Sequence, residues 1–130
     1  MVLNSAVRPI PLLIEFAAGT RLVREPDLPQ GLPIVRNGPP GTFVAFPGGL
    51  RVSLPTDQIV YADDSGDGAR VGFGGMSFAG IEGERLIFHR TREMHPEDQL
   101  SPARSRTMVL SMSWVSSISI DGHRVNMLPR

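Results

Sequence analysis

Short segments of alternating apolar and polar residues, separated by glycine and proline, dominate this sequence. The chain of 130 residues has 14 glycines and 12 prolines, spread along its length rather than gathered in one tract. Leu50, Val52 and Leu54 alternate with Arg51 and Ser53. That alternation is the period of a strand with one buried face. Because glycine and proline interrupt such segments every few residues, the pattern favours an all-β fold.

The strand-like segments recur at the spacing of a single-domain sandwich or barrel, and we expect about 8–10 short strands with little helix. Val71 and Phe73 share one phase of alternation. Met76 and Phe78 have the opposite phase, and the two glycines between them predict a β-bulge. Alternation does not distinguish a sandwich from a barrel, since both bury one face of every strand.

The segment from Pro11 to Gly19 has two interpretations. A helix that starts with proline and ends before glycine would begin at Pro11 and stop at Gly19. The same letters suit a hairpin with strands at 13–17 and 20–24, turning at Ala18-Gly19. Because the neighbouring segments are strand-like, the hairpin is favoured.

The longest alternation covers residues 108–120. It is about twice as long as a typical strand, so we expect a bend or break near Ser116-Ser117. Asp121-Gly122 then predicts a two-residue type I′ turn that pairs Ile120 with His123. The sequence thus predicts a hairpin near the C-terminus.

We expect one domain with an extended N-terminal arm. Residues 1–12 are mostly apolar, and Pro9 and Pro11 would keep them extended. Residues 13–130 would form the β-rich domain. Apolar side chains of the arm and of the C-terminal segment would pack on neighbouring subunits or, alternatively, on the protein's own sheet. The expected interface residues are Val2, Leu3, Val7, Ile10, Leu12, Met127 and Leu128.

The composition excludes several chemistries. The chain has no cysteine, and its 13 basic residues are all arginine, so thiolate and lysine nucleophiles are absent. GPPGT at 38–42 resembles the start of a phosphate-binding loop, but the later glycine and lysine are missing. The formal net charge of zero gives little support for nucleic-acid binding. We expect no cofactor.

Two polar segments hold the side chains that could act as ligands or catalysts. DDSGDG at 63–68 resembles the first half of an EF-hand loop, but Gly74 stands where that loop needs a glutamate, so a polar hairpin tip is favoured. Residues 89–98 include imidazoles and carboxylates suited to acid–base chemistry or zinc, without a known metal-site spacing. The catalytic candidates are His89, His95 and Glu93, and the metal candidates are His89, His95, Asp63 and Asp67.

These observations favour a non-enzymatic β-domain that self-associates or binds another protein, as a component of a virion-like or other large particle would. One alternative is a small β-barrel enzyme or ligand binder that uses His89 and His95. A second is a single-stranded nucleic-acid binder. Its candidate stacking residues are Phe43, Phe46, Tyr61 and Trp114.

No apolar stretch reaches the roughly 18 residues of a membrane span, so we expect no membrane partner. The expected location is the cytoplasm where the protein is made, either free or incorporated in a particle.

Overall fold

The computed structural model describes residues 10–25, 31, 33–36, 41–91 and 106–127. Across these residues the regular secondary structure is almost entirely strand, with a few short 3-10 turns, and the predicted all-β fold is confirmed. The elements are β1 (Leu12–Phe16), β2 (Arg21–Arg24), β3 (Ile34–Arg36), β4 (Thr42–Ala45), β5 (Arg51–Ser53), η2 (Thr56–Gln58), β6 (Ile59–Asp63), β7 (Arg70–Phe73), β8 (Met76–Glu82), β9 (Arg85–Arg90), β10 (Thr107–Ser111), η3 (Met112–Trp114), β11 (Val115–Ile120) and β12 (His123–Arg124). The described strands number twelve rather than 8–10, because alternation does not reveal strands as short as β12.

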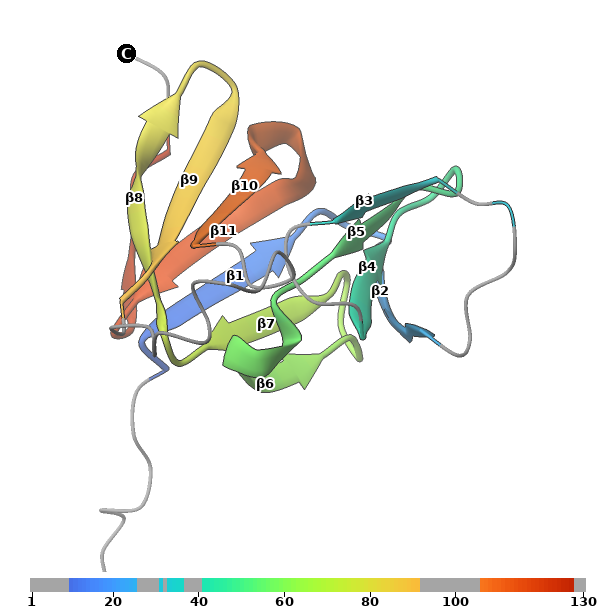
Figure 1. The fold of residues 1–130 in the computed structure, drawn as a ribbon, viewed down its shortest axis with the longest axis horizontal. Coiled ribbons are helices and arrows are strands. Elements are labelled where there is room, and N and C mark those ends of the chain that lie inside the picture. Colours follow the sequence, from blue (N-terminus) through green and yellow to red (C-terminus); the bar gives the residue numbers. More distant parts are fainter. Residues whose placement is uncertain (1–9, 26–30, 32, 37–40, 92–105, 128–130) are drawn as a thin grey trace, which may run out of the picture.

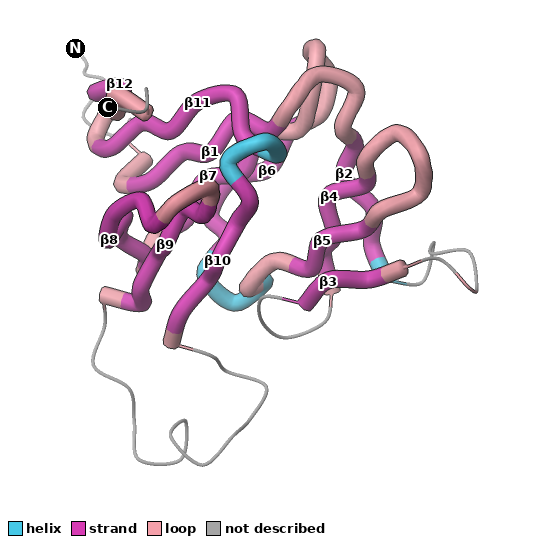
Figure 2. The backbone as a smooth tube through the Cα atoms, turned by 90° about the horizontal axis from the view of Figure 1, so that it is seen from above, coloured by secondary structure: helices cyan, strands magenta, loops and turns pink. Residues whose placement is uncertain are grey.

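The strands form three sheets, none of them closed into a barrel (Figure 1). Their orders are β12-β11-β1-β7-β6, β10-β9-β8 and β2-β4-β5-β3. The three-stranded sheet lies against the five-stranded sheet, and the four-stranded sheet stands at one side of the pair (Figure 2). The chain changes sheet several times, for example between β1 and β2 and between β7 and β8, so consecutive strands often belong to different sheets.

One apolar core joins all three sheets. Ile14 of the five-stranded sheet, Phe88 of the three-stranded sheet and Val52 of the four-stranded sheet are fully buried in the same cluster. In β1 the core residues alternate with half-buried ones, as expected for a strand with one face on the core. Burial of this shared cluster is what holds the sheets together.

The C-terminal hairpin is confirmed. Ile120 pairs with His123, and the backbone N–H of Val125 donates to the carbonyl of Ile118 at 2.8 Å. Asp121 and Gly122 have φ angles of 49° and 87°. Positive φ at both turn residues is the requirement of a type I′ turn, which the Asp-Gly pair meets.

The expected break in the long C-terminal alternation is present, but it lies earlier than Ser116-Ser117. The chain leaves β10 at the 3-10 turn η3 and enters β11 in another sheet. The ring of Trp114, at the end of this turn, packs on Phe46 at 5.8 Å between centroids. The irregularity at Ser116 is smaller: Glu15 pairs with Ser117 and Phe16 with Val115, which leaves Ser116 as an extra residue in the ladder.

Both interpretations of the N-terminal segment were wrong. Strands form as the hairpin interpretation expected, but β1 pairs with β11 and β7, whereas β2 pairs with β4. The turn at 17–20 is a corner between two sheets. Thr20 fixes it: its Oγ1 donates to the carbonyl of Ala17 at 2.8 Å and accepts the N–H of Ala69 at 2.7 Å.

Gly74 and Gly75 are likewise a corner and not a bulge within one strand. They connect β7 to β8, which lie in different sheets. The N–H of Gly74 donates to the carbonyl of Gln58 at 2.8 Å. A Cβ at Gly75 would lie 1.8 Å from Oε1 of Gln58, so the Gln58 side chain would have to move to accommodate any larger residue there. Bulges are found instead at Val60 of β6 and Ala79 of β8.

A bidentate ion pair connects the three-stranded sheet to η2. The two terminal nitrogens of Arg90 donate to the carboxylate oxygens of Asp57 at 2.9 and 3.1 Å, and the Arg90 side chain is only 7% exposed. Burial alone would raise the pKa of Asp57, but its bonds to Arg90 and the arginine charge, with a smaller contribution from Gln58, hold that pKa below the ordinary value. The pair therefore stabilises the fold wherever Asp57 is ionised.

We expect Asp57→Asn to lower the free energy of unfolding at pH 7 by about 2 kcal/mol, because it removes a charge-assisted pair from a nearly buried arginine. Since the folded pKa is lowered, this contribution is complete above the unfolded aspartate pKa of about 3.9 and fades as the pH falls through the folded value. Urea unfolding at pH 7 and at pH 3 measures the loss of unfolding free energy and its dependence on pH. Glu25→Gln, which breaks an exposed pair with Arg36, is the control and should cost less. Equal losses for the two variants would contradict this account.

Candidate protein-interaction surface

The segment 63–68 is the tip of the β6–β7 hairpin, and the carboxylates of Asp63 and Asp64 already have partners within the fold. Asp63 forms an ion pair with Arg70 and accepts the N–H of Ser65 at 3.0 Å. The backbone hydrogen bond from Ser65, followed by the Arg70 side chain, holds the pKa of Asp63 well below its usual range. Asp64 accepts the N–H of Leu22 at 2.9 Å, which fastens the tip to β2. The backbone carbonyl of Asp67 accepts the N–H of Gly19.

The histidine candidates are not brought together in the described part of the chain. His89 is an exposed residue of β9, opposite Ser77 and Thr107 in the sheet. His95 and Glu93 lie outside the described residues. Among residues that the structure describes, no group of three or more histidine, aspartate or glutamate side chains could hold a metal ion.

The aromatic residues considered for base stacking are dispersed. Phe43 is fully buried, and Phe46 and Trp114 pack on each other. Tyr61 is the one with a large exposed fraction, 37%. Three of the four side chains thus contribute to packing within the fold, so they do not form an open stacking platform.

The predicted interface residues have different positions. Leu12 is 1% exposed and belongs to the core of the chain itself. Met127 packs against the core at its margin. Ile10 is half-buried on the sheet surface. The other four, Val2, Leu3, Val7 and Leu128, lie outside the described residues.

Large apolar side chains are exposed at one edge of each sheet. Among the described residues they lie on the edge strands β3, β6 and β8, with one more, Ile120, at the end of β11. Val60 of β6 has the largest exposed fraction, 62%, and Tyr61 follows it in the same strand. An edge strand also presents unpaired backbone N–H and C=O groups, so an apolar edge is a template for pairing with another chain.

Ile10, Val60 and Tyr61 form what we call the β6 edge surface. Ile10 and Tyr61 meet above Gly72 of β7: a Cβ there would lie 2.7 Å from Cγ2 of Ile10 and 3.1 Å from Cβ of Tyr61. Val60 lies over Gly74 in the same way, at 2.8 Å from a Cβ placed there. The two glycines therefore make room for the apolar side chains at this edge.

Sequence reasoning placed Ile10 in an interface but missed Val60 and Tyr61. The signal that could have found them is the segment IVYA at 59–62, which is apolar at both phases of alternation. A strand with one polar and one buried face would not have this pattern. The bulge at Val60 removes it from simple alternation and turns it outward.

Within the described residues, no helix is long and apolar enough to cross a membrane. Comparisons with known proteins give no significant match, whether by family model, by curated sequence or by solved structure.

Proposed function

We propose that this chain is a non-enzymatic assembly domain that associates with further copies of itself through the β6 edge surface. The observation that carries the proposal is Val60, a large apolar side chain that is 62% exposed on a sheet edge. Tyr61 and Ile10 extend the apolar area beside it. Such a pair of copies could serve as the repeating unit of a virion-like or other large particle.

A two-fold arrangement suits this edge. Two copies of β6 running antiparallel would join two five-stranded sheets into one, and the same residues would meet from both sides. Equal numbers of basic and acidic residues, 13 of each, leave little net repulsion between copies.

We expect the affinity between two copies to be moderate. Fully burying a side chain such as valine contributes about 1.5–3 kcal/mol, and each copy would contribute Val60 with part of Tyr61 and Ile10. Backbone pairing adds to this, while association costs about 4–15 kcal/mol in lost freedom. The balance predicts a reversible association that depends on protein concentration.

Val60→Asp should prevent the association. The two-fold arrangement would bring the introduced charges of both copies together, which costs several kcal/mol and weakens association by about a hundredfold or more. Light scattering over an about hundredfold range of concentration measures the result. The wild-type mass should rise to at least twice that of the 14.1 kDa chain, and the variant should remain a monomer.

Ile81→Asp is the matched control, since Ile81 is an exposed apolar residue on the edge strand β8 of another sheet. It should associate like the wild type. The proposal would be contradicted if the wild-type chain stayed monomeric at every concentration. It would also be contradicted if the Val60→Asp chain reached the same mass as the wild type.

A further inference from the structure

The strand β12 covers only part of the outer edge of β11. β11 has six residues, yet it pairs with β12 only at Ser119 and Ile120. The bond from Val125 to Ile118 extends the contact by one step. From Val115 to Ser117, no described strand pairs with β11 on this side, although β1 pairs with it on the other. We call this half of the edge, which has no strand partner among the described residues, the open edge.

A cavity of about 570 Å³ lies at the open edge, between β11 and the segment that follows β12. Its volume is in the range of small-molecule pockets, about 300–1,000 Å³, so a few side chains of a partner would fit in it. The residues that line it are Met112, Ser116, Ser117, Arg124, Val125, Asn126 and Met127.

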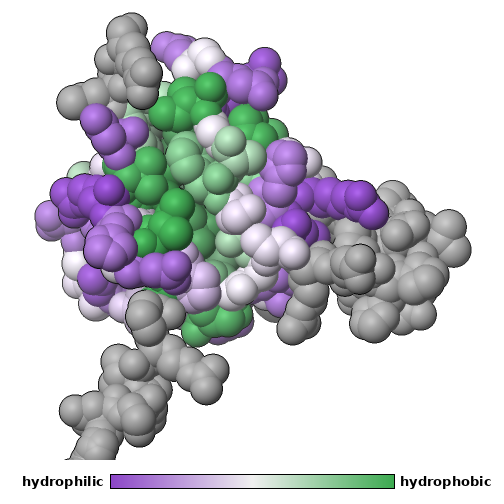
Figure 3. Space-filling model, turned by 90° about the vertical axis from the view of Figure 1, so that its left-hand side faces the viewer, coloured by the Kyte–Doolittle hydropathy of each residue, from purple (hydrophilic) through white to green (hydrophobic). Residues whose placement is uncertain are grey.

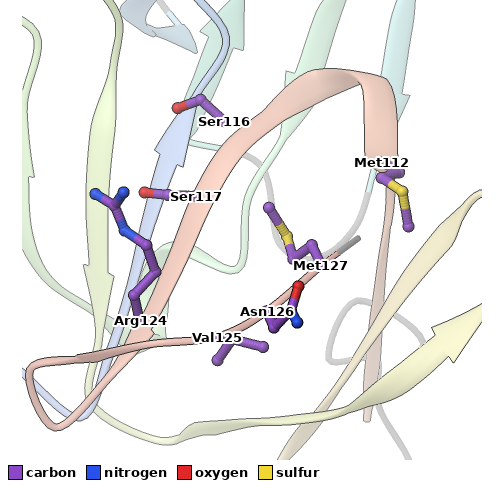
Figure 4. Close-up of a pocket in the computed structure, with 7 residues that line it drawn as sticks. All are labelled: Met112, Ser116, Ser117, Arg124, Val125, Asn126 and Met127. Carbon is purple, nitrogen blue, oxygen red and sulfur yellow. The ribbon is translucent and has the colours of Figure 1, made fainter. Parts of the chain in front are cut away.

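The two sides of this groove differ in chemistry. In Figure 4, Met112 and Met127 lie on one side of β11, whereas the side chains of Ser117 and Arg124 point to the other side. Figure 3 shows hydrophobic surface gathered on the side of the molecule where β8 lies, bordered by hydrophilic residues. A strand lying in the groove would have one face toward the methionines and the other toward Arg124.

The polar side has donors that lack acceptors. Among the described residues Arg124 has neither an ion pair nor a hydrogen-bond partner for its side chain. Ser117 is 6% exposed, and its Oγ is buried without a hydrogen bond in the described structure. Ser117 is therefore out of reach of a partner, whereas Arg124 is exposed and an ionised carboxylate could accept from its guanidinium.

We propose that the groove binds an extended segment of another protein, which adds as a strand to the open edge of β11. Alternate residues of the segment would be apolar, against Met112 and Met127, and the residues between them would include a glutamate or aspartate facing Arg124. Backbone bonds to β11 would supply affinity and the acidic residue would supply selectivity. This site lies at the opposite edge of the five-stranded sheet from β6 and shares no residue with the β6 edge surface.

The test uses the full chain, labelled with nitrogen-15, and two capped hexapeptides observed by amide NMR. One peptide has the sequence Val-Glu-Val-Glu-Val-Thr, and the other has glutamine in place of both glutamates. The acidic peptide should shift amides of residues 115–118 and 125–127. It should bind the wild type roughly fivefold more tightly than the neutral peptide, as an ion pair worth about 1 kcal/mol requires.

Arg124→Gln is the matched variant, and because Arg124 is exposed the fold should persist. The two peptides should bind this variant equally, while Val60→Asp should keep the wild-type preference. The proposal is overturned if millimolar acidic peptide shifts none of these amides, or if the wild type binds both peptides alike. It is also overturned if the same amides shift with protein concentration alone, because a second copy would then occupy the groove.

Discussion

Gly68→Ala should lower the free energy of unfolding by about 3 kcal/mol, near the upper end of what single substitutions cost. A Cβ at Gly68 would lie 2.5 Å from the carbonyl oxygen of Ala17 and 2.8 Å from that of Phe16. Neither oxygen can retreat easily, because both belong to the corner that Thr20 holds to Ala69. The substitution must therefore open the junction between the five-stranded sheet, which contains β1, and the four-stranded sheet, which contains β2.

Gly66→Ala is the control for this effect. It lies in the same hairpin tip, and a Cβ there would meet nothing within 4 Å. Neither Gly66 nor Gly68 has a positive φ angle, so the two substitutions differ mainly in contacts. Urea unfolding followed by the fluorescence of Trp114, the single tryptophan, should show a change within about 0.5 kcal/mol for the control. Similar losses for both variants would show that the close contact at Gly68 does not matter.

Phe88→Ala should destabilise the chain by about 3–5 kcal/mol, the usual cost of truncating a buried phenylalanine. Phe88 is fully buried on β9, the middle strand of its sheet, with its ring 5.4 Å from that of Phe78. Since the three sheets share one core, the loss of packing at Phe88 should destabilise all three of them. Phe78→Ala, at the half-buried neighbour, should cost less.

Two probes can show whether the core is shared in energetic terms. Far-UV circular dichroism reports all the strands, and Trp114 reports the contact with Phe46 beside the four-stranded sheet. In Phe88→Ala both signals should move together to one lower urea midpoint. Separate midpoints would mean that the sheets unfold independently.

The local features of the fold could be predicted because they depend on neighbouring residues. Alternation of apolar and polar side chains identified the strand around 50–54, and the strand-like neighbouring segments favoured a strand at 13–17. The turn at Asp121-Gly122 could be predicted with its type, since positive φ angles are tolerated by this pair. The two strands that this turn connects then had only one pairing register that kept the apolar face continuous.

The pairing of strands could not be predicted in the same way. Ala18-Gly19 looks like a hairpin turn in sequence, but Thr20 bonds to Ala69, far along the chain, and directs the strands into different sheets. Gly74-Gly75 has the same ambiguity. Alternation gives the phase of each strand and says nothing about its neighbour, which depends on distant contacts.

The candidate surface was only partly visible in the sequence. Apolar residues near the termini suggested an interface that includes Ile10, and the structure places Ile10 beside Tyr61. Val60 could equally have been a core residue of a strand buried on both faces. Only its position on an edge strand, with the bulge, shows that it is exposed.

Amide hydrogen exchange tests the pairing of β6 most directly. The wild-type chain would be compared at one concentration below the rise in mass and at one well above it. If two copies pair through this edge, outward-facing amides of Val60 to Ala62 should exchange more slowly at the higher concentration, while those of His123 and Arg124 on β12 should not change. Equal exchange of the β6 amides at both concentrations, despite a rise in mass, would contradict the account and place the contact elsewhere.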